Sequence, residues 1–481
     1  MNDKYNLRSF PAKVLLIIPP QEDNMFIYST PNLGVGYIGA AVKKEGHTVK
    51  VFDSTFYHDY LKELEKDVEE YKPDIAGITG FTFQYPRMDD FAKLIKKVSP
   101  ETIVVFGGVH ATVLPKLILE RNSSVDFVML GEAELSFPEF LKALNNKTGF
   151  KNIAGLAFRD GSDIVINPSK FIENIDDLSY PWAVINPLDY QKGQVHGFTA
   201  KNKPITQVIS SRGCPYQCTF CAGRTVLGSK IRMRDAHKFV DELEYLKTKF
   251  GMKEIQVIDD NFTFYREHAI KVCNEMIKRK LNISWSLPNG VRADKLDDEL
   301  LDKMKESGCF YMSFGIEFGS ERMLNVCKKA LKLEKARESV TLANKHGFIT
   351  QGFFLMGHPE ETIEDMKLTA DFIRSVPLDK ILISQPFPYP GSGLFDYYLK
   401  NRYGNDIRNV NWDKFKDMDF PRIFENVTQA EQRECRKKVY LRFYLNPWNA
   451  LRFISKFRTW FQYRVAWQGF TILIKTLTGR Q

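Results

Sequence analysis

The sequence lacks the features of a secreted or membrane-spanning protein. The N-terminus has no long apolar run after its charges, and its one apolar stretch, Val14 to Ile18, has the length of a strand. No window reaches the roughly 18 apolar residues that a spanning helix needs. No cysteine precedes Cys214, and the total of seven is odd. These absences argue against a disulfide framework and predict a cytoplasmic protein in a reducing compartment.

Acidic residues are absent from the C-terminal end of the chain. Residues 441–481 contain seven Lys and Arg and no Asp or Glu, which leaves a net charge of only +2 on the first 440 residues. Because the basic character is local, and because no recognition motif accompanies it, we expect no nucleic-acid partner. The total of 481 residues, 43% of them hydrophobic, instead predicts a globular protein of two or three domains.

Residues 13–145 alternate between strand-like and helix-like segments. Apolar runs such as KVLLII and TIVVFGG alternate with segments that carry apolar residues at helical spacing. This pattern predicts an α/β fold with a doubly wound parallel sheet, covered by helices on both faces. Ligands of such sheets bind outside the carboxyl ends of the strands. Those ends carry Thr79-Gly80, Gly107-Gly108 and Gly131-Glu132.

The rest of the chain changes character twice. Residues 151–205 contain a predicted hairpin and several prolines, typical of a connector. Residues 206–395 return to the strand–helix alternation, with about six units, which predicts a partial barrel. Residues 396–481 are helical and aromatic. We therefore divide the chain into a first domain (1–150), a connector (151–205), a core (206–395) and a C-terminal helical region (396–481).

Three cysteines lie in the loop SRGCPYQCTFCAG, just after a predicted strand. Cys214, Cys218 and Cys221 can bind three irons of a cubane cluster and leave the fourth iron open to a further ligand. A zinc site or three unrelated cysteines are the alternatives. Zinc usually requires a fourth Cys or His nearby, and the closest downstream candidate is His237 on the following predicted helix. The pattern therefore favours a 4Fe–4S cluster.

The cysteine spacing, with Phe220 before the third cysteine, resembles the radical S-adenosylmethionine (SAM) superfamily. IDDNFTF (258–264), RAD (292–294), FGIEFGS (314–320) and GFFLMGHPEET (352–362) follow in the order of that family's strand-end motifs. The resemblance implies that SAM binds here. Its candidate contacts are Phe220, Asp259, Asp260, Asn261, Arg292, Glu317 and Gly357. Helix capping by Asp259 and Asp260, and a structural role for Glu317, are the alternatives.

The first domain resembles the cobalamin-binding domain of a subset of these proteins, through VLLIIPP (14–20), VVFGGVHAT (104–112) and LGEAE (130–134). The resemblance implies bound cobalamin. An Asp-x-His-x-x-Gly signature is absent, however, since His58 lies five positions after Asp53. His110 is a candidate contact or an ordinary polar loop residue. The other candidate corrinoid contacts are Thr79, Gly80, Phe81, Gly107, Gly108, Val109, Gly131 and Glu132.

The C-terminal region alternates Trp and Phe with Lys and Arg. This pattern favours a helix at an anionic membrane surface, with a helical lid on the barrel as the alternative. Together with the core, it resembles the branch that contains anaerobic magnesium-protoporphyrin ester cyclases and hopanoid-associated members. The resemblance implies a hydrophobic or lipid-like substrate and a protein peripheral to the inner membrane face.

The predicted function is that of a radical SAM enzyme. A 4Fe–4S cluster would cleave SAM, and the resulting radical would functionalise an unactivated carbon of the substrate. Cobalamin-dependent methylation is favoured. Radical-driven cyclisation, coupling or rearrangement is the second hypothesis, and a non-catalytic cluster or corrinoid scaffold is the third. A flavodoxin- or ferredoxin-type protein is the expected reductant.

Overall fold

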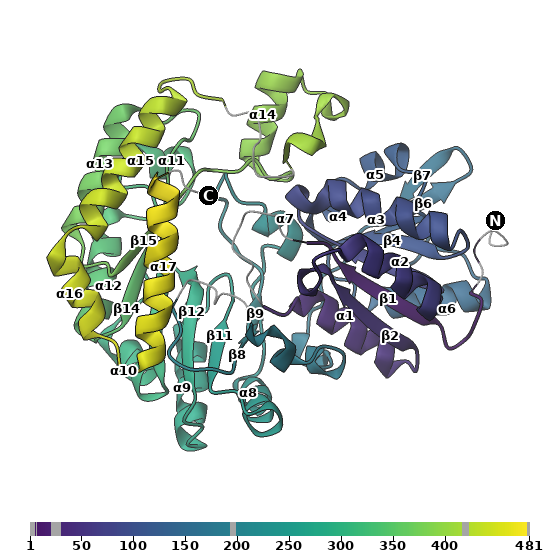
Figure 1. The fold of residues 1–481 in the computed structure, drawn as a ribbon, viewed down its shortest axis with the longest axis horizontal. Helices are drawn as coiled ribbons and strands as arrows, with labels where there is room; N and C mark the ends of the chain where they lie inside the picture. Colours follow the sequence, from purple (N-terminus) through teal and green to yellow (C-terminus); the bar gives the residue numbers. More distant parts are fainter. Residues whose placement is uncertain (1–4, 6, 21–29, 193–198, 416–422, 479–481) are drawn as a thin grey trace. The chain divides into compact units, whose positions relative to one another are not determined.

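The computed structural model describes residues 5, 7–20, 30–192, 199–415 and 423–478, with side chains in the last helix described as far as Thr471. Its contacts separate two compact units. The first unit contains Met1–Asn186, Cys221–Ser229 and Pro388–Pro421, and the second contains Pro187–Phe220, Lys230–Phe387 and Arg422–Gln481. Each unit is built on its own sheet, and helices end the chain (Figure 1). The predicted fold class is confirmed.

The sheet of the first unit has seven strands in the order β2-β1-β3-β4-β5-β6-β7. The first five strands are parallel, and the hairpin β6–β7 extends the sheet in antiparallel pairing. The sequence predicted the hairpin but did not indicate that it would join this sheet. The strands are β1 (Lys13–Ile18), β2 (Thr48–Asp53), β3 (Ile75–Thr79), β4 (Ile103–Gly107), β5 (Phe127–Met129), β6 (Leu156–Asp160) and β7 (Asp163–Ile166).

Helices connect these parallel strands, because two parallel neighbours need a crossover connection between them. The buried strand runs and the apolar sides of the helices form one core, in which Phe127 contacts the rings of Phe140 and Phe150. The side chain of Asn32 caps the first helix by accepting the N–H of Val35. The helices are α1 (Leu33–Lys44), α2 (Tyr60–Tyr71), α3 (Tyr85–Val98), α4 (Gly108–Val113), α5 (Pro115–Arg121) and α6 (Ser136–Asn146).

The sheet of the second unit has six parallel strands in the order β15-β14-β13-β12-β11-β8, so each strand pairs with the strand of this sheet that precedes or follows it in the chain. This is the predicted partial barrel of six units. A two-stranded ribbon, β9 (Ser211–Arg212) with β10 (Arg232–Met233), flanks the cysteine loop. The six strands are β8 (Ile205–Val208), β11 (Glu254–Val257), β12 (Ser284–Val291), β13 (Cys309–Glu317), β14 (Ile349–Leu355) and β15 (Lys380–Ser384).

The helices of the barrel begin at polar caps. Asp235, Asp297 and Thr362 each accept a backbone N–H at the start of the following helix. The side chain of Asp259 caps no helix in this way, since its described hydrogen bonds go elsewhere. The helices are α8 (Ala236–Phe250), α9 (Arg266–Lys278), α10 (Asp298–Glu306), α11 (Glu321–Val326), α12 (Leu333–Lys345) and α13 (Ile363–Ser375), with α7 (Gly223–Leu227) after the cysteine loop.

The C-terminal helices divide between the two units. Helix α14 (Gly393–Tyr403) and a 3₁₀ turn at Trp412–Phe415 belong to the first unit. Helices α15 (Gln429–Tyr444), α16 (Pro447–Ser455) and α17 (Trp460–Thr478) belong to the second and are the yellow-green to yellow helices of Figure 1. Among the described residues, no helix is both long enough and apolar enough to cross a membrane.

Candidate functional site

The predicted SAM contacts lie at the carboxyl ends of consecutive strands in the second unit. Asp259 and Asn261 follow β11, Arg292 follows β12, Glu317 ends β13 and Gly357 follows β14. Because parallel strands end at one edge of a sheet, this placement gathers the candidates on one rim of the barrel. Their spacing along the chain, about one strand–helix unit apart, is what made this placement predictable.

Asp259 is held by the protein itself. Its side chain is buried and accepts hydrogen bonds from Ser210 N and Oγ and from Ser211 Oγ, each at 2.6 Å. Burial raises the pKa of Asp259, while these donors oppose the rise. Asp259 therefore fixes the segment that leads into the cysteine loop, a role that the sequence alone did not indicate.

The next two residues are more available to a ligand. Asp260 is exposed. Asn261 is buried, and its Oδ1 has no hydrogen-bond partner among the described residues. A buried acceptor without a donor costs stability, and such groups in native proteins usually have a ligand or water. The orphaned oxygen next to an exposed carboxylate fits the ammonium group of SAM.

The three cysteines lie on the loop between β9 and α7. Cys214 and Cys218 are half-buried, and burial raises the pKa of both thiols. Cys221 is exposed, and its Sγ accepts the N–H of Gly223 at 3.3 Å. Among the described residues, no three Cys, His, Asp or Glu side chains are grouped closely enough for one metal ion. A cubane cluster needs no such grouping, because each thiolate binds a different iron.

Several contacts within the second unit fasten the cysteine loop to the barrel. Thr219 donates its N–H to Cys327 O at 3.0 Å. Phe220 packs against the buried cluster that contains Phe318 and Met323. Tyr216 stacks on the guanidinium group of Arg292 at 3.8 Å from the ring centroid. Phe220 therefore has a clear packing role in addition to its predicted place beside SAM.

Glu317 forms an ion pair that the sequence analysis missed. Its φ of +72° lies in the left-handed region, which a non-glycine residue rarely adopts and which often marks functional sites. Lys329 Nζ lies 2.9 Å from Glu317 Oε1 and 5.9 Å from the Phe220 ring centroid. Burial lowers the pKa of Lys329, but the charges of Glu317 and Cys218 outweigh this effect and raise it overall.

Arg292 and Gly357 are held tightly by their surroundings. The Arg292 guanidinium group donates to the carbonyls of Lys329 and Ala330 and pairs with Asp294 at 3.0 Å. Gly357 has a φ of +106° and donates its N–H to Glu361 Oε2 at 2.5 Å. The donors of Arg292 are thus already used within the protein, whereas the Lys329 ammonium group has one described carboxylate partner.

The predicted corrinoid contacts lie at the carboxyl edge of the first sheet. Thr79 ends β3, Gly107 ends β4, and Gly131 and Glu132 follow β5. A Cβ on Gly108 would lie 2.5 Å from Thr79 Oγ1 and under 3 Å from the backbone of Gly80, so only glycine allows these strand ends to meet. Glu132 accepts the N–H of Ile172 at 2.8 Å. At Gly107 and Gly131 a Cβ would meet no atom closer than 3.5 Å, so the backbone at these two strand ends is open to the close approach of a ligand.

His110 is part of the interior of the first unit. It is fully buried, stacks on Tyr85 at 4.3 Å and meets the Trp412 ring edge to face at 5.0 Å. Burial lowers the pKa of His110 to about 3. His110 is therefore a packed residue of α4 rather than a polar loop residue, and a corrinoid contact by His110 stays a prediction. His58, in contrast, is exposed.

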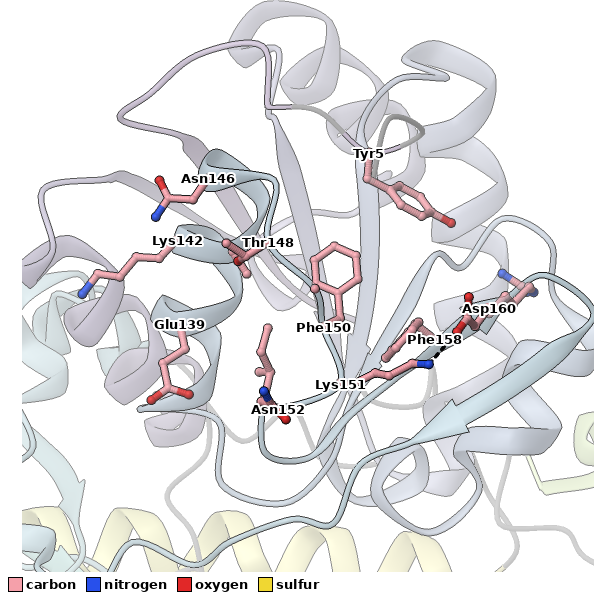
Figure 2. Close-up of a pocket in the computed structure, with 14 residues that line it drawn as sticks. Tyr5, Glu139, Lys142, Asn146, Thr148, Phe150, Lys151, Asn152, Phe158 and Asp160 are labelled. Atoms are coloured by element: carbon pink, nitrogen blue, oxygen red, sulfur yellow. Dashed lines mark ion pairs between the residues drawn. The ribbon is translucent and has the colours of Figure 1, made fainter. Parts of the chain in front are cut away.

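A cavity of about 590 Å³ also opens in the first unit (Figure 2). It is lined by the end of α6, the following loop and β6, including Lys142, Phe150 and Lys151, and by none of the predicted site residues. Lys142 is paired with Glu45 at 2.7 Å, and Lys151 is paired with Asp160 at 3.3 Å. Its two lysines are therefore already neutralised.

Two family models match the chain over the segments just described. The radical SAM superfamily model matches residues 208–373, and the B12 binding domain model matches residues 26–141. An uncharacterized methyltransferase of Pyrococcus horikoshii is 31% identical over 439 residues, covering 90% of this chain and 93% of its own. The chain belongs to the radical SAM superfamily. Within it, the chain is one of the members that carry a B12-binding domain.

Two further relatives show how widely the chemistry of similar proteins ranges. A cytidylyl-2-hydroxyethylphosphonate methyltransferase of Streptomyces wedmorensis is 29% identical and covers 79% of this chain and 80% of its own. An anaerobic magnesium-protoporphyrin IX monomethyl ester cyclase of Rubrivivax gelatinosus is 24% identical and covers 86% of this chain and 75% of its own. The second belongs to the branch that the sequence analysis named.

The cofactors follow from the family. This radical SAM enzyme uses a 4Fe–4S cluster and SAM, and its B12-binding domain binds cobalamin. The thiols of one loop supply the donor chemistry of the cluster, and the glycine-lined edge of the first sheet suits a corrinoid. The predictions of an enzyme and of these three cofactors are confirmed.

Proposed function

We propose that this enzyme transfers a methyl group from cobalamin to an unactivated carbon of its substrate. The observation that carries the proposal is the presence of a B12-binding domain and a radical SAM domain in one chain, together with a methyltransferase relative that spans nearly the whole length. When bound, the cluster and SAM supply a carbon radical, and the corrinoid supplies the methyl group.

We further propose how the chain's own residues contribute to the site. Cys214, Cys218 and Cys221 hold the cluster. Asp260 and Asn261 bind the amino group of SAM. Glu317 accepts a hydrogen bond from the ribose of SAM. Lys329, which lies beside Glu317, neutralises the carboxylate group of SAM. Phe220 and Asp259 act mainly by positioning the cysteine loop. Phe220 does so by packing on Phe318, and Asp259 by accepting hydrogen bonds from Ser210 and Ser211.

The proposed substrate is a hydrophobic or lipid-like small molecule, and the proposed reductant is a flavodoxin- or ferredoxin-type protein. The protein would act in the cytoplasm, peripheral to the membrane. The similar proteins named above act on a nucleotide-linked phosphonate and on a porphyrin ester. A substrate panel should therefore include polar phosphonates and nucleotides beside lipids and tetrapyrroles.

Anaerobic product analysis tests the proposed reaction. The enzyme is loaded with cluster and cobalamin, supplied with SAM and a strong reductant, and incubated with the substrate panel. Methyl transfer predicts both 5′-deoxyadenosine and S-adenosylhomocysteine, whereas the Cys214→Ala/Cys218→Ala/Cys221→Ala variant should produce no 5′-deoxyadenosine. A productive substrate that yields 5′-deoxyadenosine without S-adenosylhomocysteine would contradict methyl transfer and favour cyclisation or rearrangement, the chemistry suggested by the cyclase relative.

A further inference from the structure

The last helix carries a row of exposed aromatic rings. Trp460, Tyr463, Trp467 and Phe470 follow the spacing i, i+3, i+7 and i+10, which places them on one side of α17. Trp460 is 82% exposed and Trp467 is 66% exposed. Isolated apolar residues on a surface are ordinary, but a continuous row of large rings marks an interaction site. We call these four side chains the aromatic row.

The opposite side of α17 is fastened to the barrel. Val465 and Gln462 are buried, Phe461 packs on Ala200 and Ile205, and Ala466 packs against the cluster around Tyr311. The helix is therefore fixed in place by its inner side. Within the aromatic row, Tyr463 also contacts the buried Phe457 ring at 4.9 Å, whereas Trp460 and Trp467 point to solvent. Because Ile205 and Tyr311 lie at the starts of β8 and β13, α17 covers the amino-terminal end of the barrel.

The preceding helix is fixed to the same end by buried charges. Asp379, just before β15, pairs with Arg452 at 3.2 Å and with Lys456 at 2.6 Å. The exposed side of this segment adds Trp448, which is 75% exposed, and Leu451. Two of the basic residues of the tail are thus structural, so the charge available to a partner comes from others.

Three arginines supply that charge. Arg442, Arg458 and Arg464 are exposed, and none of them makes an ion pair within the described part of the chain. Residues 441–481 contain no acid that could neutralise them. Arg464 lies on α17 and Arg458 just before it, whereas Arg442 lies on α15. Exposed rings beside such cations without an ion pair have the composition of a surface that enters the headgroup region of an anionic bilayer.

We propose that α16 and α17 dock on an anionic lipid membrane through the aromatic row and these arginines. Since the candidate SAM contacts lie at the carboxyl ends of the strands, docking through the amino-terminal end leaves the rim of the barrel facing away from the bilayer. The tail then concentrates the enzyme at the membrane, and the rim stays open to the aqueous side. This proposal does not depend on methyl transfer, because vesicle binding requires no turnover.

A second copy of the chain is the main rival occupant. A two-fold contact through this face would bring the unpaired arginines of both copies together without intervening acids, which is unfavourable. Anionic headgroups satisfy the same charges. The charge of the face therefore favours a lipid surface over self-association.

The test uses the full-length, cluster-loaded protein and vesicles of phosphatidylcholine, either alone or mixed equally with phosphatidylglycerol. We expect wild type to sediment with the anionic vesicles only. Arg458→Gln/Arg464→Gln should weaken this binding about thirtyfold, and Trp460→Ala/Trp467→Ala should weaken it by about tenfold or more. Tyr245→Ala/Leu368→Ala, which removes exposed apolar side chains from α8 and α13, is the matched control and should bind as wild type does.

Three outcomes would overturn the proposal. They are failure of wild type to bind anionic vesicles, binding of the two test variants as tight as that of the control, and equal binding on neutral vesicles. Analytical ultracentrifugation of each protein accompanies the assay. A wild-type dimer that becomes monomeric in Trp460→Ala/Trp467→Ala, without vesicle binding, would assign the face to self-association. Circular dichroism confirms that the exposed substitutions leave the fold intact.

Discussion

At the scale of single residues, the site is organised by an ion pair rather than by any one motif residue. Glu317 alone in its strand-end motif would be a half-buried carboxylate with no counter-charge, which is costly. Lys329 Nζ supplies that charge at 2.9 Å, on a segment whose Lys328 and Ala330 both have positive φ. The same ammonium group faces the Phe220 ring. We therefore expect Lys329 to contribute to SAM binding.

Replacing Lys329 tests this role. Lys329→Gln should weaken SAM binding to the cluster-loaded protein by about tenfold or more, because one charge-assisted contact is lost and Glu317 is left unpaired. Lys329→Arg should recover part of the affinity. The matched control is Lys328→Gln, an exposed neighbour whose loss should change nothing. Equilibrium binding and the SAM-induced change in the cluster's electron paramagnetic resonance signal provide the measurement. Equal affinity in both Gln variants would remove Lys329 from the site.

The same pair shows what sequence patterns cannot supply. Cys214, Glu317 and Gly357 stand in recognisable strand-end segments, so their order along the chain predicts one rim. Lys329 belongs to no such segment. Its approach to Glu317 depends on the positive φ angles of Lys328 and Ala330, which no sequence pattern indicates. Asp259 illustrates the converse, since its motif suggests a ligand contact while Ser210 and Ser211 occupy its oxygens. Motifs locate a rim, whereas hydrogen bonds decide which of its residues are available.

At the scale of elements, both open edges of the partial barrel are covered by side chains. On β15, Tyr444 Oη accepts the N–H of Ile381 at 3.2 Å and donates to its carbonyl at 3.0 Å. Tyr440 Oη accepts the N–H of Ile383 at 2.8 Å. On β8, the Gln191 side chain accepts the N–H of Ile205 at 3.0 Å and donates to its carbonyl at 2.9 Å. These groups replace the missing neighbouring strands, which otherwise leave edges open to aggregation.

Removing the two hydroxyls should expose the β15 edge. Tyr440→Phe/Tyr444→Phe keeps the rings but leaves the amides of Ile381 and Ile383 without acceptors, at a cost of about 1–3 kcal/mol for each unsatisfied group. Hydrogen exchange should accelerate in β15 and in α15, which docks through these contacts. Tyr463→Phe, an exposed tyrosine on α17, is the control. Unchanged exchange in β15 would mean that the hydroxyls do not protect the edge.

Element-scale prediction succeeded where a segment was long enough to show a period. The six barrel strands and the helices α8, α9, α10, α12 and α13 make up the alternation of about six units predicted for residues 206–395, because each has a bounded apolar run or helical spacing over several turns. Helices α4, α7 and α11 have six residues or fewer and were not predicted. Edge covering by Tyr440 and Gln191 could not be inferred either, because it pairs residues far apart in the chain.

At the scale of the whole molecule, the chain passes between its two units several times. Divisions at 150, 205 and 395 follow changes in pattern along the sequence. Contacts instead assign Cys221–Ser229 and Pro388–Pro421 to the first unit. The second of these segments carries Trp412, which is buried and packs on Phe395 and Phe415 as well as on His110 and Tyr85. The first unit is thus completed by residues encoded after the barrel.

This arrangement predicts that Trp412 supports the corrinoid edge. Trp412→Ala in the full-length enzyme should destabilise the first unit by about 3–5 kcal/mol, since a large buried ring is lost. Cobalamin binding should weaken as well, because His110, which Trp412 contacts, donates its N–H to Gly80 O and bonds Thr82 Oγ1 at 3.2 Å. SAM binding should weaken less, because its candidate contacts lie in the second unit and, of the three cluster cysteines, Cys221 alone belongs to the first. Cobalamin absorbance, SAM binding and urea unfolding measure these three effects, with exposed Trp448→Ala as the control.

If cobalamin binding is unchanged while the unit is destabilised, Trp412 stabilises the fold without shaping the edge. If neither changes, residues after 388 do not complete the first unit, and the corrinoid edge depends on residues before 187 alone.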